Sequence, residues 1–130
     1  MSVASTSYDL ADACDALAQQ ITTTRNGSNW SETPGQTATL DQMVSNLQDA
    51  ADNARTAGVA ASLADATTPL ARLSDAVTKA KAAVSLLKTV NQAITLAGSL
   101  LSLAASAATG DVSGIVKSAT AVVSEVQALS

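Results

Sequence analysis

The sequence feature that most constrains the fold is a stretch of 22 residues, Thr89 to Gly110, that contains no charged side chain. Its leucines recur at spacings that fit one helix, which is typical of a segment buried against other helices. The helical pattern begins at Thr68-Pro69, where Pro fits the first turn, and continues to about Thr109. A second apolar helix follows it. The sequence therefore predicts an apolar helical hairpin over about residues 86–126.

The composition predicts a thin core. A chain of 130 residues forms one domain. Hydrophobic residues make up 47% of it, but aromatic residues make up only 2% and Phe is absent. The core must then be built from Leu, Val, Ile and Ala, without the aromatic side chains that bury the most area. Association with copies or with partners is one way to compensate for such a core.

The predicted fold class is all-α, a bundle of about four helices with a long third helix. The first helix carries Leu10, Cys14, Leu17 and Ile21 at helical spacing. Thr39 and Gln42 fit a capping box at the start of the second helix. The single domain, 1–130, is expected to contain helices over 5–24, 39–57, 69–109 and 112–129, with a loop over 25–38. The sequence leaves open whether the third and fourth helices are continuous.

No residue is predicted to be catalytic, cofactor-binding or metal-binding. Histidine is absent, and with it the side chain most used for proton transfer near neutral pH. Cys14 is the only cysteine, so neither an internal disulfide nor a CxxC motif can form, and its place on the apolar face predicts burial. Asp9, Asp12 and Asp15 are expected to form a solvated acidic face. An enzyme with a small-molecule substrate is therefore not predicted.

The charge is unevenly distributed along the chain. The net charge is −4, with −6 in residues 1–65 and +2 in residues 66–130. This asymmetry suits pairing within the chain or head-to-tail association. Five scattered cations without aromatic partners do not form a nucleic-acid surface. Because residues 1–5 have no cationic and apolar signal-peptide pattern, we expect either a cytoplasmic protein or export by a leaderless route.

Ten residues form the predicted interface for helix–helix packing or assembly. Small residues recur at every fourth position, a spacing that lets helix backbones approach closely: Gly98, Ser102, Ser106, Gly110, Gly114 and Ser118. The others follow the apolar face of the third helix: Asn91, Ile94, Leu101 and Ala105. Whether this packing lies within or between chains stays open. A core position for Asn91 would fix register, and an edge position is the alternative.

Trp30 lies in the predicted loop, where it can either anchor a partner or cover the end of the core.

The first functional hypothesis is a non-enzymatic structural or interaction protein that binds copies of itself or a helical partner. The alternative is a membrane-active protein whose hairpin inserts into lipid. The composition is similar to that of secreted helical filament subunits, and the uncharged hairpin resembles that of α-helical pore-forming toxins. Both likenesses are of composition and assign no role to any residue.

Overall fold

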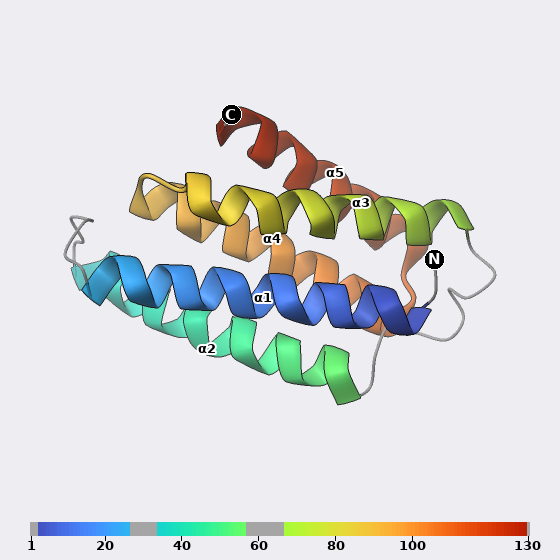
Figure 1. Ribbon diagram of the computed structural model, residues 1–130, viewed down its shortest axis with the longest axis horizontal. Helices are drawn as coiled ribbons and strands as arrows, with labels where there is room; N and C mark the ends of the chain where they lie inside the picture. The colour runs from blue at the N-terminus through green and yellow to red at the C-terminus, as the bar shows by residue number, and fades with distance from the viewer. Residues whose placement is uncertain (1–2, 27–33, 57–66, 130) are drawn as a thin grey trace.

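The computed structural model describes residues 3–26, 34–56 and 67–129. These residues contain helices and no strand, which confirms the all-α fold class (Figure 1). The elements are α1 (Val3–Asn26), α2 (Pro34–Thr56), α3 (Thr67–Ala83), the short 3-10 helix η2 (Val84–Leu86), α4 (Val90–Thr109) and α5 (Val112–Leu129). The described residues thus form five α-helices, where about four were predicted for the chain.

The helices form a closed ring of neighbours around the core. In order around the ring, α1 packs on α2, α2 on α4, α4 on α5, α5 on α3, and α3 on α1 (Figure 1). Every one of these helices contributes fully buried aliphatic side chains, including Leu17, Leu47, Leu73, Leu103 and Ile115. The core is therefore shared by the whole ring, and the C-terminal hairpin is one part of it.

The prediction of one continuous helix over 69–109 is wrong. α3 ends at Ala83, η2 follows, and Leu87 is extended, with φ −67° and ψ 127°. Thr89 is also extended and caps α4: its Oγ1 accepts the Gln92 backbone N–H, and the Gln92 side chain accepts the Thr89 N–H. This capping box satisfies donors that a helix start would otherwise leave without partners. It lets a helix begin at Val90 inside a sequence that contains no Gly or Pro.

The break moves the buried face of α4 by one residue. Along α3, Leu70, Leu73, Val77 and Ala80 recur at helical spacing and are buried. After the break the core contains Val90, Ala93, Ala97, Leu100 and Ala107. Each of these precedes a residue that an uninterrupted helix would have buried: Asn91, Ile94, Gly98, Leu101 and Ala108. The non-helical residues before Val90 change the rotation of the chain, and so those side chains lie nearer the surface.

The start of the second helix was also predicted wrongly. α2 begins at Pro34, so residues 34–38 are helical and not part of the predicted loop. Thr39 lies inside the helix, where its hydroxyl donates to the Gly35 carbonyl at 3.0 Å and caps nothing. Pro suits a first helical position because its missing N–H would have no partner there. Trp30 lies outside the described residues.

Gly110 and Asp111 separate α4 from α5, so the third and fourth predicted helices, whose continuity the sequence left open, are not continuous. Gly110 has φ 76° and its N–H bonds to the Ser106 carbonyl, which ends α4 in the left-handed conformation that glycine favours. Asp111 Oδ1 then accepts the Gly114 N–H at 3.1 Å and caps α5. These two residues reverse the chain, so that α5 packs against α4 as a hairpin.

Candidate functional site

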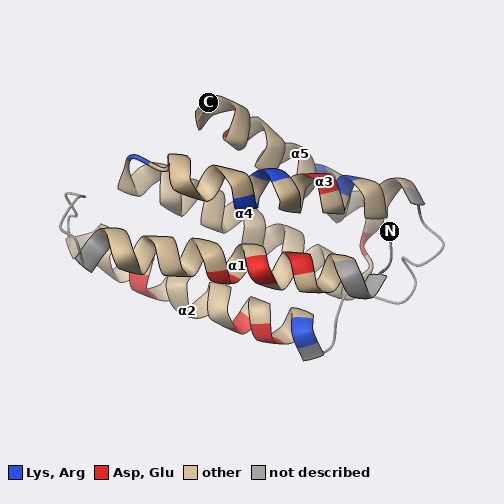
Figure 2. Ribbon diagram, in the orientation of Figure 1, with Lys and Arg blue, Asp and Glu red and all other residues tan. Residues whose placement is uncertain are grey.

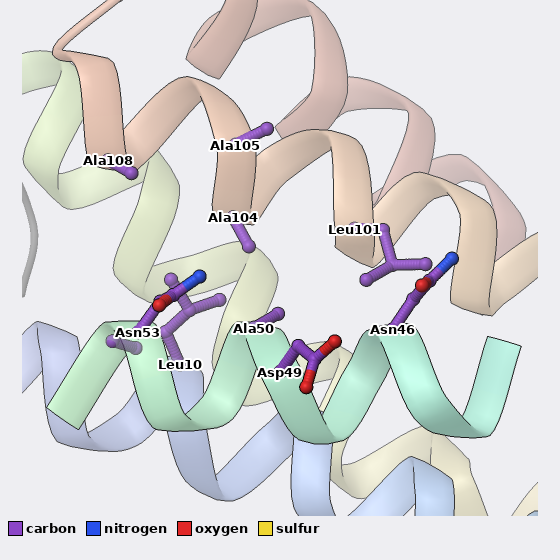
Figure 3. Close-up of a pocket in the computed structure, with 10 residues that line it drawn as sticks. Leu10, Asn46, Asp49, Ala50, Asn53, Leu101, Ala104, Ala105 and Ala108 are labelled. Atoms are coloured by element: carbon purple, nitrogen blue, oxygen red, sulfur yellow. The ribbon is translucent and has the colours of Figure 1, made fainter. Parts of the chain in front are cut away.

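A groove opens between α2 and α4, over the side chain of Leu10 in α1 (Figure 3). Its volume is about 240 Å³. We call it the α2–α4 groove; one wall is Asn46, Asp49, Ala50, Asn53 and Ala54 of α2, and the other is Leu101, Ala104, Ala105 and Ala108 of α4. Most of these side chains are alanine. Because alanine is short, it leaves an open channel between the two helix backbones.

The two walls belong to parallel helices that keep one register. Gln36 Nε2 donates to Asn91 Oδ1 at 3.1 Å, and these residues are 55 positions apart. The same offset relates the two walls, in which Asn46 corresponds to Leu101 and Asn53 to Ala108. Figure 3 shows the same order on both helices. The hydrogen bond therefore lies at one end of a contact that continues into the groove.

The predicted interface residues divide into two groups. Leu101 and Ala105 line the α2–α4 groove, and Ile94 is half-buried against the core. Asn91 and Ser102 are exposed and Gly98 is half-buried, beside the groove on the surface of α4. For Asn91 this is the edge position, the alternative to a core position. A Cβ built on Gly98 meets nothing within 4 Å, so this glycine borders open space.

The second group lies in the hairpin turn. A Cβ built on Gly114 would lie 2.5 Å from Ser106 Oγ, so the absence of a side chain at Gly114 permits the close approach of α5 to α4. Ser106 also accepts hydrogen bonds at its carbonyl from Gly110 and Asp111. For Ser106, Gly110 and Gly114, close packing occurs within the chain. Ser118 is half-buried one turn further along α5.

The two helices that neighbour α4 in the ring carry exposed charges of opposite sign, Asp49 on α2 and Lys117 on α5. Asp49 is exposed on the α2 wall. Lys117 is exposed on α5, the helix that packs on the other side of α4 from α2. Gly114 lies beside Ser106, and Glu125 bonds to Ser99 further along. Lys117 is therefore level with about Ala104, as Asp49 is, on the opposite flank of α4.

Acidic side chains predominate on α1 and α2, and basic side chains predominate on α3 (Figure 2). Arg55 contacts Asp15 at 2.5 Å and Asp12 at 3.4 Å, which joins α2 to α1, and these contacts raise the pKa of its guanidinium. Lys81 of α3 lies 3.8 Å from Asp12. The predicted acidic face of α1 is thus partly neutralised by the neighbouring helices. Within the described residues, no group of three or more His, Cys, Asp or Glu side chains could hold a metal ion.

Glu125 was not singled out from the sequence. Ser99 Oγ donates to Glu125 Oε1 at 2.6 Å, across the α4–α5 contact. Oε2 is buried, and among the described residues it has no hydrogen-bond partner. Burial raises the pKa of this carboxyl, and the hydrogen bond from Ser99 lowers it by less. The sequence does contain a sign of this partly buried carboxyl, because Glu125 is the one acidic residue after Asp111 and lies in an apolar helix.

The residues of the α2 wall were also missed. The first four of them follow one another at steps of three, one and three residues, as the four residues of the α4 wall do, and this repetition is visible in the sequence. Comparison of the chain with protein-family models, with curated proteins and with solved structures gave no significant match.

Proposed function

We propose that the protein acts without catalysis, by self-association, with α4 of a second copy seated in the α2–α4 groove. The observation that carries the proposal is the groove itself, an alanine-lined channel between two parallel helices in register. Short side chains allow a third helix to approach closely and to gain van der Waals contacts along its length. The thin core predicted from the composition gives a physical reason for association.

The α4 surface beside the groove suits a helix that enters such a channel. Its exposed and half-exposed residues Gly98, Ser102 and Ala105 are small and uncharged. Seating this surface against a copy desolvates no charge of α4, which avoids the largest cost of burying polar surface. Each copy supplies both a groove and an entering helix, which is the self-complementarity of a two-fold interface.

The flanking charges favour the parallel arrangement of the two α4 helices. When the two-fold axis runs parallel to α4, equivalent residues of the two copies lie at the same height along the axis, and α2 of one copy faces α5 of the other. Asp49 of one copy then faces Lys117 of the second copy. An antiparallel arrangement instead sets α2 against α2. The charges of α2 are Asp41, Asp49, Asp52 and Arg55, so two acidic surfaces would meet. Charge complementarity of this kind selects orientation more than it adds affinity.

The test is the mass in solution, measured by light scattering over a wide range of concentration. Wild type is expected to exceed the 12.9 kDa of one chain as concentration rises. Ala105→Glu places a charge in the groove and should return the protein to a monomer. Ala82→Glu is the matched control, because Ala82 is exposed on α3, away from the groove. A wild type that stays monomeric throughout, or equal behaviour of the two variants, contradicts the proposal.

The orientation has its own test. Asp49→Lys and Lys117→Asp should each weaken association, and the double variant should restore it. Thr109→Cys should form a disulfide with the same residue of a second copy, because only the parallel arrangement brings the two α4 C-termini together. The parent protein is the control, since its Cys14 is buried. If dimers form without this disulfide, the parallel orientation of the two α4 helices is wrong, but the proposal of self-association is not contradicted.

Membrane association is the second candidate function. Among the described residues one helix, Val90–Thr109, is long and apolar enough to cross a membrane, and 39% of its apolar window is buried in the bundle. The measurement is co-sedimentation with anionic lipid vesicles. Ser102→Glu adds a charge to α4 at an exposed site and should abolish binding, whereas Thr78→Glu on α3 should not. A wild type that does not bind vesicles removes this candidate.

A further inference from the structure

The C-terminal half of α5 is seated between two hollows. One, of about 220 Å³, lies between α4 and α5 and is lined by Glu125, Leu129 and residues near the start of α4. The other, of about 300 Å³, lies between α3 and α5 beside Val123. In Figure 1 the C-terminal end of α5 projects beyond α3. Val122 is fully buried in this half of α5, as Ile115 is in the other. The hollow between α4 and α5 therefore flanks the part of the helix that follows Val122.

The contact between Ser99 and Glu125 is a polar link between α4 and α5 beside this hollow. One carboxyl oxygen of Glu125 accepts a 2.6 Å hydrogen bond from Ser99, and the other is buried, with no partner among the described residues. An ionised carboxylate in this position lacks hydration on one oxygen, a cost that the neutral acid largely avoids. Burial accordingly raises the pKa of Glu125, and Ser99 opposes this only in part.

No charge on the neighbouring elements compensates the carboxylate. α4 has no charged residue, and those of α3 are Arg72, Asp75, Lys79 and Lys81. Lys79 pairs with Asp75, Lys81 lies by Asp12, and Arg72 and Asp75 line the hollow on the opposite side of α5. Lys88 precedes α4, and Lys117 lies two turns earlier on α5. None of these charges is among the causes of the Glu125 shift.

We propose that Glu125 is a protonation-controlled latch, which holds the C-terminal half of α5 on α4 when it is neutral and loosens it when it is ionised. In the opened state Glu125 is hydrated and titrates near its ordinary value. When α5 is packed on α4, Glu125 binds its proton more tightly. Protonation therefore favours the packed state, and this effect is complete below the ordinary pKa of Glu. The advantage is lost as the pH rises through the higher value of the packed state. Acid therefore closes this contact, and neutral or alkaline pH loosens it.

The experiment is hydrogen exchange of the α5 amides in the wild-type chain, expressed as protection factors at about pH 4 and about pH 8. We expect protection over Val122–Leu129 to fall at least about threefold between these values, since each tenfold change corresponds to a difference of one between the two pKa values. Glu125→Gln should keep high protection at both. Asp41→Asn, at an exposed carboxyl of α2 that does not line the groove, is the matched control and should behave as wild type.

Equal protection at the two pH values in wild type, or the same pH dependence in Glu125→Gln, overturns the latch. A titration of the Glu125 side-chain carbon by NMR in wild type gives a test that needs no variant. A midpoint above the ordinary Glu value supports the latch, and one at or below it overturns it. Neither readout depends on self-association, and Ala105→Glu should retain the effect. The latch and the proposed function can therefore fail separately.

Discussion

Gly114 faces Ser106 across the α4–α5 turn at a distance that leaves no room for a side chain. A Cβ on Gly114 would lie 2.5 Å from Ser106 Oγ and 2.7 Å from Asp111 Oδ2. Gly114→Ala must therefore shift the Ser106 hydroxyl and the Asp111 carboxyl, which caps α5. We expect the free energy of unfolding to fall by about 1–3 kcal/mol, as for other overpacked sites, in denaturant titrations followed by circular dichroism.

The matched control is Gly98→Ala on α4. A Cβ there meets nothing within 4 Å, and Ala exceeds Gly in helix propensity by about 0.8–1 kcal/mol. Gly98→Ala should therefore raise the stability. If both substitutions stabilise the protein, α4 and α5 do not approach each other at Gly114 as described.

Thr89 is predicted to be the residue that permits the break between α3 and α4. Removal of its hydroxyl in Thr89→Ala leaves the Gln92 N–H without its partner, and loss of such a cap costs about 1 kcal/mol. Thr39→Ala is the comparison, since Thr39 lies inside α2 and caps nothing. Its free energy of unfolding should stay the same or rise. Equal losses in the two variants would contradict the assignment of Thr89 as the cap.

Gly110 should tolerate substitution according to how well the new residue adopts a positive φ. With φ 76°, Gly110→Ala forces an L-residue into the left-handed region, at a cost of about 1–2 kcal/mol. Gly110→Asn should lose less, because Asn enters this region more readily. Thermal unfolding of the two variants ranks them, and a greater loss for Asn than for Ala would contradict the assigned turn.

The sequence predicts the parts of the fold that are set by local chemistry. The Leu10–Cys14–Leu17–Ile21 face of α1 is buried as its spacing indicates, and α5 has its predicted bounds. Gly110 and Asp111 form the expected turn, since the left-handed conformation and the side-chain cap are both properties of single residues. Such features need no knowledge of the neighbouring helices.

The break before α4 could have been found, because Thr89 and Gln92 have the capping-box spacing. The apolar spacing through this region suggested an uninterrupted helix instead, and the one-residue shift of the buried face followed from that error. The α2–α4 groove is different in kind. It depends on which helices are neighbours and on their 55-residue register, and neither is a property of a local sequence pattern.

The direction of the Glu125 effect also bears on the two candidate functions. A hairpin that inserts into lipid must first leave the bundle, and ionisation of Glu125 loosens α5 from α4. Insertion of an ionised carboxylate into hydrocarbon is costly, so the pH that opens the hairpin also opposes its insertion. Self-association through the α2–α4 groove meets no such conflict, because Glu125 lies outside the groove.

Cys14 is predicted to be inert while the protein is folded. Its thiol is buried among α1 core residues, and burial, with a smaller contribution from Asp15, raises its pKa to about 12. The thiolate is the reactive form, so labelling by a thiol reagent should need opening of the bundle. The folded state favours the neutral thiol, so this contribution to stability is complete below the ordinary thiol pKa and is lost as the pH rises toward 12. We expect labelling at pH 8 to be slow and to reach the rate of a free cysteine only in denaturant. Rapid labelling under native conditions would mean that α1 does not hold Cys14 in the core.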